Sequence, residues 1–283
     1  MVHSKNSRTL SARPSIGLSY SESTRRIISK TPSIVDHIEV SYELLQARPQ
    51  SWEHLQVHPL ILHCASLSLA GSVRPPRETL ASIQNWLEAT NSPWLGEHIG
   101  YHLYSSLSVE DQDSTESTGY TLAPPMNLVT AERTANQIEE AARYFDCDIL
   151  VENPPLYYTP PRSTLTQTEF IRNILSSSNA SLLLDLTHLK IASMNCGFCP
   201  LHALKQLPLE LVREVHVSGI RLEQGIAWDD HSAIVPHDVL NLLVYVCTQT
   251  AVEAITLEYN LTSELKDSAI IDQVHRVRDL VGQ

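Results

Sequence analysis

Two patterns of apolar residues alternate along the chain. Short, mostly apolar runs rich in β-branched residues are followed by longer segments with helical spacing, such as Ala135, Ile138, Ala142 and Phe145. Strands that alternate with helices are typical of βαβ units and a parallel sheet. The predicted strands cover residues 16–20, 37–41, 59–64, 95–101, 149–153, 181–186, 214–217 and 254–259, and the predicted helices cover 79–89, 130–145, 167–176, 237–250 and 264–281.

Eight strands in a chain of 283 residues predict an α/β protein with a single (β/α)8 TIM barrel, a fold that routinely reaches this length as one domain. Residues 1–13 are polar and basic, and we expect a disordered N-terminal tail ahead of a TIM-barrel catalytic domain at 14–283. Residues 105–119 are rich in Ser, Thr, Asp and Glu, which predicts a mobile surface loop after the fourth strand.

Composition narrows the functional class. The formal net charge of −12 argues against a nonspecific nucleic-acid binder, which needs a basic face. No apolar run approaches the roughly 18 residues of a membrane span, and the N-terminus lacks the apolar core of a secretory signal. The five cysteines are odd in number and scattered, which fits a reducing compartment. We therefore expect a cytoplasmic protein with no nucleic-acid or membrane partner.

Charged and imidazole side chains stand at the end of almost every predicted strand. A buried parallel strand should be nearly continuous in apolar residues, so each exception needs a physical reason. One such residue alone is more often a hydrogen-bonded structural residue than a metal ligand, but all the strands of a barrel end at one rim. The strand-end residues are His63, Glu97, His98, Glu152, Asp185, His216 and Glu258, while Glu39 and Glu43 flank the second strand.

Metal ions would remove the repulsion between carboxylates that are gathered at one rim. Two short-range pairs add mixed oxygen and nitrogen donors, Asp185 with His188 and Asp229 with His231. Histidine and carboxylate donors without thiolates favour iron, manganese or zinc. Because the donors outnumber those of one tetrahedral zinc, the sequence predicts about two or three metal ions.

Several short motifs occur in an order that resembles a known family. This family is the multinuclear non-heme iron-dependent oxidative enzymes, formerly the DUF692 proteins, which include the oxidase of methanobactin biosynthesis. The matching motifs are IGLSY at 16–20, LHCASLSL at 62–69, GEH at 96–98, VENP at 151–154, LLDLTH at 183–188, EVHVSG at 214–219, DDH at 229–231 and LE at 257–258.

The resemblance implies a TIM-barrel oxidoreductase with about two or three iron ions in mixed Fe(II) and Fe(III) states, and with O₂ as co-substrate. Its implied substrate is a ribosomally synthesised precursor peptide, in which it modifies a residue, often cysteine, during natural-product biosynthesis. The resemblance also implies a partner protein that presents the peptide. The implied iron ligands are His63, His98, Glu152, Asp185, His188, His216, Asp229, His231 and Glu258.

Three further residues are expected to orient the ligand imidazoles without binding metal themselves, namely Glu97, Asn153 and Glu43. One loop departs from the family pattern. Where many relatives have Asn-x-Gly-x-Asp-Pro, this chain has a CxxC motif, with Cys196 and Cys199 between Asn195 and Pro200. The motif is compatible with a redox pair, with half of a zinc site, or with two ordinary loop cysteines.

Two other functions are compatible with the same donors. One is a zinc- or manganese-dependent TIM-barrel hydrolase or isomerase, which needs no oxygen. The other is a metal-dependent binding protein without turnover. Metal analysis and O₂ consumption with a candidate peptide would distinguish these functions from peptide oxidation.

Overall fold

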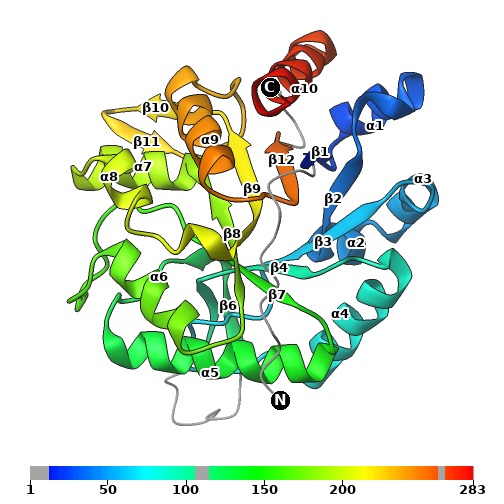
Figure 1. Cartoon of the computed structure of the whole chain (residues 1–283). Coiled ribbons are helices and arrows are strands. Elements are labelled where there is room, and N and C mark those ends of the chain that lie inside the picture. Colours follow the sequence, from blue (N-terminus) through cyan, green and yellow to red (C-terminus); the bar gives the residue numbers. More distant parts are fainter. Residues whose placement is uncertain (1–12, 106–114, 261–264, 283) are drawn as a thin grey trace.

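The computed structural model describes residues 13–105, 115–260 and 265–282. Eight parallel strands close into a barrel, in which the first strand pairs with both the second and the last. The predicted (β/α)8 TIM barrel is confirmed, and its helices lie outside the strands (Figure 1). Around the barrel the order is β1 (Ser15–Ser19), β12 (Ala254–Glu258), β9 (Val212–Ser218), β8 (Ser181–Asp185), β7 (Ile149–Glu152), β4 (Leu95–His98), β3 (Leu60–Cys64) and β2 (His37–Ser41).

All five predicted helices are present. The helix predicted from residue 130 begins two residues earlier, because the side chain of Asn127 caps it by accepting a hydrogen bond from the Thr130 amide. None of the helices among the described residues is long and apolar enough to cross a membrane. The predicted helices are α4 (Arg77–Thr90), α5 (Leu128–Phe145), α6 (Gln167–Ser176), α9 (His237–Gln249) and α10 (Asp267–Val281).

The helical spacing did not predict the remaining helices. The longest of them, α7, follows β8 without a loop, and its buried residues include Leu186, Leu189, Ile191 and Ala192 on several sides. A helix buried on several sides lacks the polar face that makes a helical pattern visible. The elements missed are α1 (Glu22–Lys30), α2 (Tyr42–Ala47), α3 (Trp52–Leu55), α7 (Leu186–Cys196) and α8 (Pro200–Leu204), with the 3-10 helices η1 (Pro32–Ile34), η2 (Pro49–Ser51) and η3 (Leu209–Leu211).

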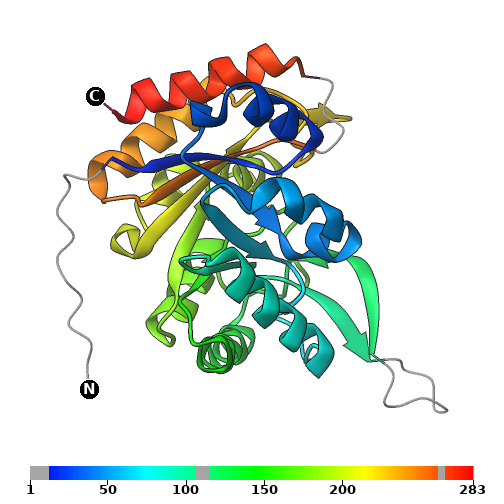
Figure 2. The ribbon, with the colours of Figure 1, turned by 90° about the vertical axis from the view of Figure 1, so that its right-hand side faces the viewer.

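Two hairpins are added to the barrel. The first pairs β5 (Tyr101–Ser105) with β6 (Thr115–Leu122), and Figure 2 shows it projecting away from the strands. The prediction of a loop at 105–119 is therefore wrong for its described part, residue 105 in β5 and residues 115–119 in β6; residues 106–114 lie outside the described residues. A projecting hairpin buries little surface, so its polar composition does not exclude strands. The second hairpin pairs β10 (Arg221–Glu223) with β11 (Ile226–Trp228).

The barrel interior changes from apolar to polar along the strands. A separate cluster of buried residues, Ile61, Trp94, Leu150, Leu183 and Ala254, lies toward the strand beginnings. Side chains two positions apart in a strand share a face. The residues two positions after Ile61, Leu150 and Leu183 are therefore expected to point into the barrel as well, and they are His63, Glu152 and Asp185.

The sequence also predicted a disordered N-terminal tail at residues 1–13. Residues 1–12 of the expected tail lie outside the described residues, so the tail remains a prediction.

Candidate metal centre

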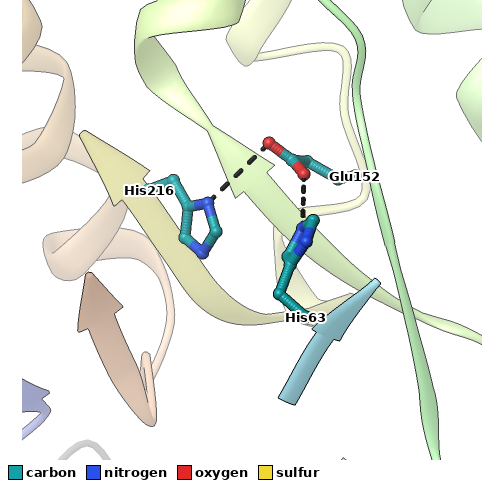
Figure 3. Close-up of side chains that lie close together, drawn as sticks. All are labelled: His63, Glu152 and His216. Atoms are coloured by element: carbon teal, nitrogen blue, oxygen red, sulfur yellow. Dashed lines mark hydrogen bonds and ion pairs between the residues drawn. The ribbon is translucent and has the colours of Figure 1, made fainter. Parts of the chain in front are cut away.

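Glu152 occupies the centre of the polar layer. Its side chain is almost fully buried, and its two carboxylate oxygens lie within 4 Å of ring nitrogens from four histidines. Figure 3 shows two of these histidines pointing at the carboxylate from β3 and β9. The four distances are 2.8 Å to His63 Nε2, 3.0 Å to His98 Nδ1, 3.2 Å to His188 Nδ1 and 3.8 Å to His216 Nδ1.

A second group of donors adjoins the first through His188. The Nε2 atom of His188 lies 2.8 Å from Asp229 Oδ2 and 3.7 Å from Asp185 Oδ2. On the other side of Asp229, His231 Nε2 lies 2.9 Å from Oδ1, and it is 3.7 Å from Glu258 Oε2. The structure thus brings all nine residues that the motifs implied as ligands into one connected cluster.

Local backbone structure places these donors. Asp185 caps α7, because its Oδ1 accepts a hydrogen bond from the His188 amide at 2.5 Å, and this leaves Oδ2 for the cluster. His231 has a φ of 53°, a left-handed conformation that is uncommon for a residue other than glycine. Unusual backbone conformations of this kind concentrate at functional sites.

Four sets of three donor atoms lie close enough to share a cation. Within each set the atoms are within 4.8 Å of one another, and all are imidazole nitrogens or carboxylate oxygens of described residues. Such donors suit iron, manganese and zinc. The sets are His63 with Glu152 and His216; His188 with Asp229 and His231; Glu39 with His216 and Glu258; and Glu152 with Asp185 and His188.

The cluster contains buried polar atoms whose hydrogen-bonding capacity is unused. A buried polar atom without a partner costs roughly 1–3 kcal/mol, and native proteins contain few of them. Here the atoms converge, and even the 2.9 Å contact between His231 and Asp229 lacks hydrogen-bond geometry. This pattern fits bound cations. The atoms without a hydrogen-bond partner are Asp185 Oδ2, His216 Nδ1, Asp229 Oδ1, His231 Nε2 and Glu258 Oε2.

The electrostatics of the cluster also favour positive charge. Burial opposes the charged form of His63, but the hydrogen bond to Glu152 and the charge of Glu39 outweigh it and raise its pKa to about 10. Burial likewise opposes charge on His231, yet Glu258 and Asp229 raise its pKa to about 9. Without metal, protons therefore supply positive charge that the carboxylates require.

Asn153 contacts the cluster in two ways. Its side chain donates to the main-chain oxygen of Asp185 and accepts from the Asp185 amide, which fixes the end of β8. Its main-chain oxygen lies 2.9 Å from His188 Nδ1. A hydrogen bond donated by Nδ1 there would leave Nε2 of the neutral ring with its lone pair free for a cation shared with Asp229 and Asp185.

Glu97 and Glu43 accept hydrogen bonds mainly from main-chain amides near β3 and β4. Glu97 accepts hydrogen bonds from the amides of Leu67 and His98. Glu43 accepts from the Ala65 amide and the Ser66 hydroxyl. Among the described residues, neither carboxylate makes a hydrogen bond or ion pair with an imidazole, so any orienting effect passes through the backbone around β3 and β4.

The sequence places Glu39 at the second strand without indicating a role in the site. Its Oε2 atom lies 2.8 Å from His216 Nε2, and both side chains are buried. That contact leaves Nδ1 of His216 facing Glu152 and Glu258. The signal in the sequence was the alternation of β2, in which His37, Glu39 and Ser41 share one face.

A second buried polar group lies deeper in the barrel. Glu214 accepts hydrogen bonds from Trp94 Nε1 at 2.7 Å and from the Thr256 hydroxyl at 2.9 Å. Thr256 lies 3.0 Å from His37 Nε2, and His37 Nδ1 lies 2.7 Å from the Ser15 hydroxyl. We call these five residues the lower network. None of their side-chain polar atoms is among the buried atoms without partners.

Glycine at position 17 is required by this network. A Cβ atom added there would lie 2.1 Å from His37 Nε2, so only glycine lets β1 pass the ring.

The two cysteines of the CxxC motif lie apart from the cluster. Cys196 ends α7 and Cys199 precedes α8, and both line a cavity of about 560 Å³ with Phe198 and His202. Neither thiol belongs to the donor sets found among the described residues, and both are free. The redox and zinc interpretations of the motif stay predictions.

Comparison with protein families decides where the chain belongs. A family model described as RiPP precursor modification enzyme MbnB/TglH/ChrH matches residues 15–281. The chain belongs to this family. This membership confirms the resemblance that the ordered motifs predicted.

Curated relatives bear the name UPF0276 protein. One from Streptomyces avermitilis is 27% identical over 199 residues, covering 70% of this chain and 40% of its own length. Another, from Chromobacterium violaceum, is 25% identical over 203 residues, covering 72% of this chain and 70% of its own. The chain thus spans less than half of the Streptomyces protein.

Solved structures share the fold at low sequence identity. A xylose isomerase domain protein from Alicyclobacillus acidocaldarius superposes with a TM-score of 0.60 at 15% identity, covering 95% of this chain and 98% of that one. The 3-keto-D-glucoside 4-epimerase YcjR from E. coli has a TM-score of 0.58 at 13% identity, covering 94% of this chain and 100% of that one. At such identities the likeness shows the fold alone.

Proposed function

We propose that this protein is a multinuclear iron- and O₂-dependent oxidase or oxygenase that modifies a residue of a ribosomally synthesised precursor peptide. The residue that we propose is cysteine. Family membership supports the peptide as substrate class. The observation that carries the proposal is the convergence of the nine buried or half-buried cluster residues, five of which have an atom without a hydrogen-bond partner.

The donor sets indicate which side chains would hold the ions. Glu152 belongs to two of the four sets and contacts four histidines, so its carboxylate would help to hold more than one ion. Asp229 and His231 close the cluster from the loop after β11. Iron bound there would supply the one-electron chemistry with O₂ that amino-acid side chains lack.

The protein's own part is to admit and position the substrate. A cavity of about 640 Å³ opens over the cluster, and its lining includes His63, Asp229, His231 and Glu258. A substrate side chain that enters this cavity reaches the cluster from its more exposed side, since His231 of the lining is about a quarter exposed whereas His216, which does not line the cavity, is buried. The buried side stays closed to water, which limits side reactions.

A zinc- or manganese-dependent hydrolase or isomerase is the alternative. The donors suit these metals, and one solved structure of the same fold is described as the IOLI protein with a binding zinc atom. Oxygen use separates the two functions, because hydrolysis and isomerisation consume no O₂.

The test is metal analysis of anaerobically purified protein, followed by O₂ consumption with a cysteine-bearing precursor peptide encoded beside the gene. We expect about two or three iron ions per chain and O₂ uptake coupled to a mass change of the peptide. The Glu152→Gln variant should lose both, while the exposed control Glu140→Gln should keep them. Full peptide modification by iron-free protein would refute the proposal.

A further inference from the structure

The cavity over the candidate metal centre is lined by five acidic side chains and, apart from histidines, by one basic side chain. Among its lining residues, all of which are described, Arg48 is the single lysine or arginine. The acidic residues of the same lining are Glu39, Glu43, Asp229, Asp230 and Glu258.

Each of these carboxylates has a partner of its own. Glu39 and Glu258 lie near His216, and Asp229 lies between His188 and His231. Asp230 is paired with Arg221 and hydrogen-bonded by Ser232. Glu43 accepts from the backbone and hydroxyl groups that follow β3. The acidic lining is thus held in place without help from Arg48.

The guanidinium of Arg48 makes no hydrogen bond or ion pair with any described residue. Arg48 follows α2, and its main-chain amide, not its side chain, closes the helix by donating to the Leu44 oxygen. The side chain is exposed. An arginine that lines an acidic cavity yet has no carboxylate partner retains its full capacity for an external anion.

We propose that Arg48 binds a carboxylate of the substrate and thereby sets the direction in which the substrate enters the cavity. This inference rests on the proposed function. A guanidinium pairs with a carboxylate through two parallel hydrogen bonds, which fixes orientation as well as adding affinity. The cations of the metal centre would offset the carboxylates of the cluster, so that an anionic substrate is not repelled.

The cavity lining combines residues of two kinds, which supports a fixed direction of entry. It includes the cluster residues His63, His231 and Glu258. It also includes Arg48, together with Leu44 and Ala47 of α2. A substrate with its carboxylate at Arg48 presents its other end, such as a cysteine thiol, to the metal centre.

The substrate carboxylate is either the C-terminal carboxylate of a peptide or the side chain of an acidic residue, and matched probes distinguish these two sources. N-acetylcysteine and N-acetylcysteine amide differ only in a terminal carboxylate. N-acetyl-Asp-Cys-amide and N-acetyl-Asn-Cys-amide differ only in a side-chain carboxylate. Binding of each probe to the iron-loaded protein is measured anaerobically by calorimetry, so that the readout does not depend on turnover.

Wild-type protein should prefer the carboxylate member of at least one pair by about tenfold or more. In Arg48→Gln this preference should fall to about twofold or less, while the affinity for the amide probe and the iron content stay unchanged. Arg48→Lys should keep part of the preference, because it retains charge without the forked geometry. The control Arg77→Gln alters an exposed arginine of α4 outside the cavity lining and should behave as wild type.

Two results would overturn the proposal while leaving the proposed function intact. One is equal affinity of wild-type protein for both members of each pair, and the other is an undiminished preference in Arg48→Gln. If iron-loaded protein binds none of the thiol probes, or if the protein takes up no iron, the proposed function fails and this inference fails with it.

Discussion

The barrel encloses two groups of buried polar side chains, and they differ in how their hydrogen bonds are satisfied. In the lower network, Glu214 is held by Trp94 and Thr256, and Thr256 in turn contacts His37. In the candidate metal centre, carboxylates and imidazoles converge but leave buried atoms without partners. Residue type alone does not separate the two groups, since both contain Glu and His on strands. Buried polar atoms whose hydrogen bonds are complete indicate a structural role. Buried nitrogen and oxygen atoms that converge without hydrogen-bond partners indicate a site for cations.

The largest effect should come from removing the central carboxylate. Glu152→Gln keeps the shape of the side chain but loses the charge that faces four histidines. We expect iron affinity to fall by more than about 100-fold, beyond the usual effect of residues behind the ligands. Metal analysis after equilibrium dialysis measures this, with far-UV circular dichroism as the check on folding. Retention of the full iron content would show that Glu152 is not a ligand.

The next prediction concerns Glu39, whose carboxylate contacts His216 of the cluster and whose strand, β2, also carries His37 of the lower network. Glu39→Ala takes away the partner of Nε2, so the ring loses its fixed orientation. Iron affinity should fall by about 10–100-fold, and Glu39→Gln, which can still accept a hydrogen bond, should recover part of it. The same dialysis measurement applies. Equal losses in both variants would contradict a positioning role.

The lower network should respond in stability rather than in metal content. Trp94→Phe removes the indole N–H that donates to buried Glu214. The free energy of unfolding should fall by about 1–3 kcal/mol, with iron content per folded chain unchanged. Urea denaturation and metal analysis of the same sample check both halves. A loss of iron without a loss of stability would contradict the structural role that we assign to the lower network.

The smallest effect is a pH dependence confined to the metal-free protein. The folded-state pKa values of His63 and His231, about 10 and about 9, lie above the ordinary value of about 6.5. Their contribution to stability is therefore fully present below about pH 6.5 and is lost as the pH rises through 9 to 10. We expect the melting temperature of metal-free protein to decline across this window, and that of iron-loaded protein to decline less. Parallel declines would mean that metal does not replace these protons.

The sequence predicted most of the barrel but not all of the elements around the candidate metal centre. Strands such as 149–153 and 181–186 were predicted within a residue of β7 and β8, because buried parallel strands are continuous apolar runs. The hairpin strand β6 was not, because its polar residues resemble a loop. Nor was α7, which carries His188, because its apolar residues do not form one stripe.

The limits within the site have a similar cause. His63, Glu152 and Asp185 stood out as polar residues at the ends of apolar runs. Glu39 was named only as a residue that flanks the second strand, because its contact with His216 joins residues 177 positions apart. Such a contact depends on barrel closure, which no local pattern reports.

The most direct measurement of the central claim is anomalous diffraction at the iron absorption edge from crystals of anaerobically purified protein. The account predicts about two or three iron peaks, each within coordination distance of His63, Glu152, Asp185 or the other six cluster residues. Absence of iron from the cluster, or iron held instead by Cys196 and Cys199, would contradict it.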